Sequence, residues 1–187
     1  MHLRHRIALG TVLLGLLAGR SAFAAPLVCD VAVETWRHRI YHDRDGAPSF
    51  TRPLALATCA AVVVEAIDAG VDPVLAVAVA AHESHFNPFA FRSTGERGAL
   101  QAKPYHCVDH LDRRCADVDD HLRAGVRLLA ALVARGGTEL GIEAYHCGWS
   151  GATREHGWLP CRQYRDRIDA RVRVLRTGVA REAIALR

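Results

Sequence analysis

The sequence predicts a single, mostly α-helical domain held together by disulfide bonds. Apolar residues recur at helical spacing in several segments, and capping residues mark the ends of some of them. The chain has 187 residues, of which 50% are hydrophobic and 24% charged, which suits one globular domain. Its six cysteines form an even set.

The first 24 residues are typical of a secretory signal peptide. A basic start precedes an apolar run at residues 7–18, and the small residues Ala22 and Ala24 stand three and one places before the expected cut. The run is shorter than the roughly 20 residues that a membrane span needs. We therefore expect an exported protein, periplasmic or secreted, with no stable membrane anchor and with residues 25–187 as its single domain.

The charge balance argues against a nucleic-acid partner. The expected leader carries three arginines and no acidic residue, so its removal lowers the formal net charge from +4 to +1. A near-neutral chain without a basic block has no electrostatic attraction to nucleic acid.

In an oxidising compartment the six cysteines favour disulfides over metal ligands. Sequence alone does not choose among the pairings. Nearest-neighbour pairing is the starting hypothesis: Cys29 with Cys59, Cys107 with Cys115, and Cys147 with Cys161. The nearby histidines lack zinc spacing, since His82 and His85 are three apart where the helical protease motif needs four. We expect no metal and no cofactor.

The expected helices follow in order along the chain. A short amphipathic segment near residues 31–40 precedes a turn at 45–48, and a largely buried helix over 54–69 ends at Gly70. Asp72 as N-cap and Pro73 at the first helical position start the next helix, which ends near Glu83.

The second half of the expected fold begins with an irregular stretch. Proline and glycine punctuate residues 84–105, which predicts a structured loop with a short hairpin. Asp117 or Asp119 then caps a helix that stops at residues 136–137. A shorter helix over 138–146, a loop rich in glycine and tryptophan, and a final helix from about Arg162 complete the chain.

Glu83 stands in an unusual place, at the last turn of a strongly apolar helix. The negative end of the helix dipole and a low-dielectric setting both favour the neutral carboxyl group. A carboxylic acid that is protonated near neutral pH can protonate a glycosidic oxygen, which is a poor leaving group until it gains a proton. On position alone, a solvated helix-end residue is nevertheless the better interpretation.

Three sequence blocks change that balance. Glu83 begins the string E-S-H-F-N-P, and G-E-R-G-A-L-Q follows, with Gln101 placed 18 residues after Glu83. The string A-Y-H-C-G spans residues 144–148. These blocks resemble the E-S-x-F-x-P, G-A-x-G-L-M-Q and A-Y-N-x-G patterns of the soluble, goose-lysozyme-like lytic transglycosylases. The resemblance covers about residues 72–149.

This resemblance implies a lysozyme-like helical domain with an irregular insert after the catalytic helix. It implies that Glu83 is the single acid and base, that Gln101 lines a glycan groove, and that Tyr145 approaches the Glu83 carboxyl group and the sugar. The substrate would be peptidoglycan, cut between N-acetylmuramic acid and N-acetylglucosamine. The muramic C6 hydroxyl would close on the anomeric carbon, and the product would be a 1,6-anhydro sugar.

The chain departs from the family pattern at informative positions. The usual serine is replaced by Arg92, which leaves Ser93, one step later, as the candidate serine contact. The usual asparagine is His146, which still donates and accepts hydrogen bonds. Trp149, beside the third block, is a candidate for stacking on a sugar.

Two alternatives stay open. One is a lysozyme-like hydrolase on the same fold, in which Asp109 or Asp112 directs water to the anomeric carbon. The other is an inactive peptidoglycan-binding or assembly protein. A secretion or conjugation apparatus is a candidate partner, while phage-derived and wall-recycling roles fit the chain equally well.

Overall fold

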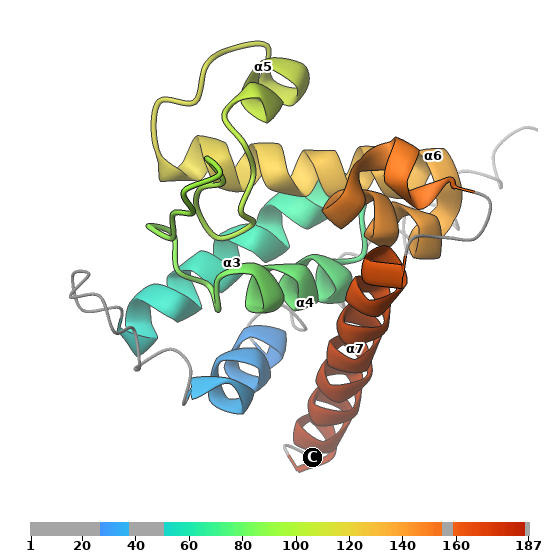
Figure 1. Cartoon of the computed structure of the whole chain (residues 1–187). Coiled ribbons are helices and arrows are strands. Elements are labelled where there is room, and N and C mark those ends of the chain that lie inside the picture. Colours follow the sequence, from blue (N-terminus) through green and yellow to red (C-terminus); the bar gives the residue numbers. More distant parts are fainter. Residues whose placement is uncertain (1–26, 38–50, 155–158, 186–187) are drawn as a thin grey trace, which may run out of the picture.

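The computed structural model describes residues 27–37, 51–154 and 159–185. Within them the fold is helical, as predicted (Figure 1). A helical segment at residues 27–35 is followed by α3 (Arg52–Asp68), α4 (Pro73–Glu83), α5 (Tyr105–Leu111), α6 (Val118–Ala152) and α7 (Leu159–Ala185). The expected signal peptide and the expected turn at 45–48 lie outside the described residues. Among the described helices, none combines the length and apolar character needed to cross a membrane.

Helix α4 is the buried core element, and it carries Glu83 at its end. Every residue from Leu75 to Ala81 is buried, which fits a helix that is apolar on all faces. It packs against α3 and α7, and α7 crosses it at a steep angle in Figure 1. Its start is built as predicted: Pro73 is the first helical residue, and the Asp72 carboxylate accepts a hydrogen bond of 2.9 Å from the Val74 N–H.

Glycines set the breaks that the sequence predicted. Gly70 has a φ of 71° after α3, the left-handed conformation of a helix C-terminus. Helix α6 leaves helical geometry at Gly137 and Gly148, with φ values of 78° and 71°, so its first part stops where expected. The chain after Gly148 was expected to be a loop, but residues 149–152 return to helix.

The insert between α4 and α6 differs from the prediction in two ways. It forms no regular hairpin among the described residues, and its antiparallel pairing is limited to isolated bridges, Phe91 with Arg97 and Arg97 with Ala102. It also contains α5, a short helix that was not predicted, because seven residues carry too little periodicity to be recognised.

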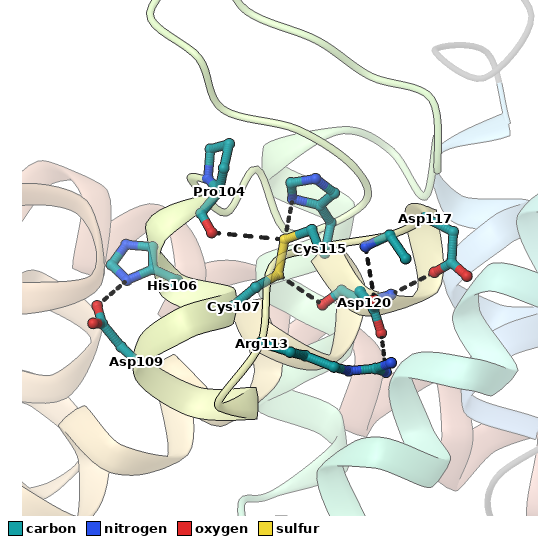
Figure 2. The surroundings of a disulfide bond; sticks show 10 residues. Pro104, His106, Cys107, Asp109, Arg113, Cys115, Asp117 and Asp120 are labelled. Atoms are coloured by element: carbon teal, nitrogen blue, oxygen red, sulfur yellow. Dashed lines mark hydrogen bonds and ion pairs between the residues drawn. A yellow bond between two sulfur atoms is a disulfide. The ribbon is translucent and has the colours of Figure 1, made fainter.

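Nearest-neighbour disulfide pairing is confirmed for all six cysteines. Cys29–Cys59 joins the helical segment at 27–35 to α3, and Cys147–Cys161 joins α6 to α7. The third bond, Cys107–Cys115, closes the chain after α5 (Figure 2). Because its sulfurs bond each other, their proximity to His121 is not a metal-ligand set.

The disulfide region is fastened to the start of α6 by Asp120. This aspartate is 2% exposed, and its carboxylate accepts hydrogen bonds from the Arg113 side chain and from the Ala116 N–H (Figure 2). Burying a carboxylate without hydrogen-bond partners would cost free energy, and these contacts offset that cost. The network holds α5, and with it one wall of the cleft described next.

Candidate active site

A cleft of about 440 Å³ opens at the end of α4. It brings together four of the five site residues predicted from the sequence, namely Glu83, Gln101, Tyr145 and His146, and Trp149 lines it as well. The fifth, Ser93, is exposed and does not line the cleft. Residues more than sixty positions apart in the chain therefore share one surface, as the three sequence blocks require.

The Glu83 side chain is nearly buried at this surface, with 8% exposed. The Tyr164 hydroxyl donates a hydrogen bond of 2.6 Å to Oε1, and the Arg92 Nη2 atom lies 3.6 Å from Oε2. Burial raises the pKa of Glu83, although the Tyr164 hydrogen bond and the Arg92 charge act to lower it. The carboxyl group is thus biased toward its protonated form, while its ionised form still has partners.

Tyr164 is a functional candidate that the sequence did not reveal. It lies in α7, within the final helix that the sequence predicted, and its side chain is buried. A buried tyrosine hydroxyl needs a hydrogen-bond partner, which was the available signal. The partner lies in another helix, and only the packing of α7 on α4 identifies it as Glu83.

Tyr145 was expected to approach the Glu83 carboxyl group and the sugar, and that role stays a prediction. Its hydroxyl donates a hydrogen bond of 2.6 Å to the Leu100 carbonyl and not to Glu83. It still lines the cleft, and burial together with the nearby Glu83 charge raises its pKa well above the usual range. Its hydrogen bond to Leu100 therefore supports the wall of the cleft.

The side chains of the three sequence blocks tie the insert to the core. Ser84 Oγ donates to the Ala99 carbonyl at 2.8 Å, and Gln101 Nε2 donates to the Gly98 and Ala90 carbonyls at 2.8 and 3.2 Å. Together with the Tyr145 hydrogen bond, these contacts satisfy buried carbonyls in a segment that has no regular secondary structure. They place the insert beside Glu83.

Two histidines enclose the ring of Tyr164. The His146 ring stacks on it with centroids 4.5 Å apart and an interplanar angle of 6°, and the His82 ring meets it edge-on at 5.1 Å. Burial lowers the pKa of His82 to about 4 and also lowers that of His146. Both rings are therefore neutral near pH 7 and act as packing surfaces for Tyr164.

Glu96 is a second carboxylate in the cleft, which the sequence reasoning missed. It accepts a hydrogen bond from the Thr94 hydroxyl, and Lys103 Nζ lies 3.5 Å from Oε1. The Thr94 hydrogen bond lowers the pKa of Glu96, and the Lys103 charge adds to the shift. The expected aspartates are not in this position: neither Asp109 nor Asp112 lines the cleft.

A signal for Glu96 was present in the second block. Glu96 stands at the position of the alanine in the G-A-x-G-L-M-Q pattern that the second block resembles, so the chain has a charge where that pattern has none. The sequence does not show that this charge belongs to the site, because only the fold of the insert places Glu96 in the same cleft as Glu83.

A second hollow, of about 510 Å³, lies around Phe89, Phe91 and Asp117. The carboxylate of Asp117 accepts a hydrogen bond from the Asp120 N–H as the N-cap of α6. The carboxylate that lines this hollow is thus the N-cap of α6, whereas the Glu83 cleft holds a nearly buried carboxyl group with a raised pKa, and the chemistry points to the smaller cleft.

Comparison with known proteins agrees with this geometry. The family model described as the transglycosylase SLT domain matches residues 63–157, about half of the chain. The chain belongs to the SLT transglycosylase family. The matched part of this SLT domain contains Glu83, the insert and the whole of α6, whereas Tyr164 lies beyond it.

The SLT domain also has a structural relative. The X-ray structure of an inactive mutant of the lytic transglycosylase Slt from Pseudomonas aeruginosa matches it with a TM-score of 0.60 at 15% sequence identity. The match covers 80% of this chain and 30% of that chain, so the SLT domain spans under a third of its relative. At this identity the match shows the shared fold. No curated protein sequence matches the chain.

Proposed function

We propose that this chain is a peptidoglycan lytic transglycosylase that cleaves the bond between N-acetylmuramic acid and N-acetylglucosamine. Glu83 acts as its single acid and base. The observation that carries the proposal is a nearly buried carboxyl group with a raised pKa, set in a cleft beside the family's own sequence blocks. An acid of this kind meets the first demand of glycosidic cleavage.

In the first step neutral Glu83 donates its proton to the glycosidic oxygen, and the bond from that oxygen to the anomeric carbon breaks. Positive charge develops on the sugar while Glu83 becomes a carboxylate. The Tyr164 hydroxyl at Oε1 stabilises that carboxylate as it forms.

In the second step the Glu83 carboxylate takes the proton of the muramic C6 hydroxyl, and that oxygen bonds to the anomeric carbon. The product is a 1,6-anhydro sugar, no water is consumed, and Glu83 is again protonated. One carboxyl group serves both steps because it gives and regains the same proton.

Digestion of purified cell walls tests the proposal. Wild-type protein is expected to lower wall turbidity, and mass spectrometry of the released fragments is expected to find anhydro ends. Glu83→Gln should abolish cutting, while Glu139→Gln, at a glutamate that is 82% exposed and outside the cleft, should leave it unchanged. Wall binding without cutting by the wild type would instead support the inactive binding protein.

A hydrolase is the second candidate, and Glu96 is the observation that favours it. Two carboxyl groups of one cleft, the first with a raised pKa and the second with a lowered pKa, form the pattern of an acid and a base. In this version Glu96 would direct water to the anomeric carbon. Digestion in heavy-oxygen water separates the two, because only hydrolysis places the label on the new reducing end.

The proposed location is outside the cytoplasm. Three disulfides favour an oxidising compartment, which is also where peptidoglycan is accessible. Residues 1–24 remain the proposed export signal. Cell fractionation of the full chain and of a form lacking these residues tests it, and export of both forms would contradict the assignment. A secretion or conjugation apparatus as partner also stays a prediction.

A further inference from the structure

Arg92 holds a position that the proposed two-step chemistry does not fully explain. Its backbone is fixed in the insert, where its N–H donates to the Glu96 carbonyl at 3.0 Å and its carbonyl accepts from the Gly95 N–H at 2.9 Å. Its side chain is 55% exposed, yet Nη2 reaches to 3.6 Å from Oε2 of the nearly buried Glu83. The guanidinium therefore reaches the acid from the solvent side.

This ion pair exists in only one protonation state of Glu83. Before the first step Glu83 must be neutral, and a neutral carboxyl group offers Arg92 little electrostatic attraction. The other carboxylate of the cleft, Glu96, is already engaged by Thr94 and Lys103. When Glu83 is neutral and ready to react, the Arg92 guanidinium is a cation with planar donors beside the reacting acid. It then has no anionic partner among its described protein contacts.

The substrate carries a fitting anion in the right place. The muramic ring, whose anomeric carbon is attacked, bears a lactyl group two carbons away. Where the stem peptide has been removed, this group ends in a free carboxylate, and where the peptide is attached it ends in an uncharged amide. An arginine side chain binds carboxylates through paired, charge-assisted hydrogen bonds.

We propose that Arg92 is a specificity-determining residue that binds the free lactyl carboxylate of the muramic residue being cleaved, so that the enzyme prefers glycan strands without stem peptides. When Glu83 is ionised, its carboxylate pairs with Arg92, and in the substrate complex the lactyl carboxylate takes the place of Glu83. The exchange releases Glu83 from its cationic neighbour at the moment when it must hold a proton. This inference rests on the proposed function and names the substrate class of the same site.

The test compares three glycans that share one backbone. The first is denuded strands with free lactyl carboxylates, the second is the same strands with those carboxylates converted to methylamides, and the third is peptide-bearing strands. Wild type should cut the first with a kcat/KM about tenfold above the other two, the scale of one charge-assisted hydrogen bond. Arg92→Ala should raise KM on denuded strands and cut all three within about twofold of one another.

Two further variants serve as controls for the charge and for the position of Arg92. Arg92→Lys keeps the charge but loses the paired donors, so it should retain only part of the preference. Arg97→Ala removes a neighbouring arginine that lies over the Phe91 ring and makes no ion pair with Glu83 among the described residues, and it should behave as wild type. Thermal melts establish that each variant is folded.

Binding separates this inference from the proposed function. Glu83→Gln mimics the neutral acid, so it should bind denuded strands more tightly than methylamide strands, and the added Arg92→Ala change should remove the difference. If wild type cuts no glycan while this binding preference holds, the proposed function fails and the anion site stands. Equal cutting of free and methylamide strands by wild type, a preference that survives Arg92→Ala, or faster cutting of peptide-bearing strands overturns the inference.

Discussion

The hydroxyl of Tyr164 lies 2.6 Å from Oε1 of Glu83, although 81 positions separate the two residues in the chain. This contact links α7, which lies outside the part matched by the SLT family model, to the proposed catalytic end of α4. It makes the last described helix part of the site and not only a support for the core.

Tyr164→Phe tests that link with almost no change in volume. The variant removes a hydrogen bond to the carboxylate worth about 1.5 kcal/mol, so kcat should fall about tenfold. Because the Tyr164 hydrogen bond lowers the pKa of Glu83, its loss should raise that pKa and move the alkaline limb of the pH–rate profile to higher pH. An unchanged profile would show that the contact does not tune Glu83.

Gly125→Ala probes how closely α6 supports the insert. A Cβ atom at Gly125 would stand 2.4 Å from Leu100 Cβ, next to Gln101. We expect a loss of about 1–3 kcal/mol in the free energy of unfolding and a lower kcat. Gly178→Ala is the matched control, since its Cβ would meet Val31 Cγ1 at 2.5 Å, away from the cleft. That variant should lose stability but keep kcat, and equal kcat in both would argue against the supporting role.

The Cys147–Cys161 bond is expected to stabilise the site as well as the fold. It closes a loop with a sequence separation of 14 and joins α6 to α7 just before Tyr164. Replacing both cysteines by serine should lower the free energy of unfolding by about 2–4 kcal/mol, measured by denaturant titration. A variant with wild-type stability would show that helix packing alone holds α7 in place.

The stability of the protein should fall as the pH drops from about 6.5 toward 4. Burial lowers the pKa of His82 from 6.5 to about 4, with Arg171 and Arg167 adding to the shift. In that window the unfolded chain binds the proton and the folded chain does not, so acid favours unfolding. His82→Phe keeps the edge contact with Tyr164 and should flatten this slope in denaturant titrations at several pH values. A slope equal to that of wild type would assign the effect to other groups.

What could be read from the sequence was mostly local. The cap at Asp72 and Pro73, the glycine breaks and the disulfide pairing depend on neighbours in the chain, and all are confirmed. The family resemblance is also confirmed. It could be read from the sequence because its blocks are short strings.

The remaining parts depend on tertiary packing. Tyr164 contacts Glu83 only because α7 crosses α4, and Glu96 enters the cleft only because Gln101 and Ser84 hold the insert in place. Neither of these placements produces a periodic pattern in the sequence. The expectation that Tyr145 approaches Glu83 and the sugar stays a prediction, and the hydrogen bond of its hydroxyl to the Leu100 carbonyl likewise depends on packing between distant segments.

The most direct measurement is mass spectrometry of glycan fragments produced by wild-type protein and by Glu83→Gln under identical conditions. If Glu83 gives and regains the proton, wild type releases anhydro-ended fragments and the variant releases none. Fragments from wild type that carry only ordinary reducing ends, or anhydro ends that persist in the variant, would contradict the account.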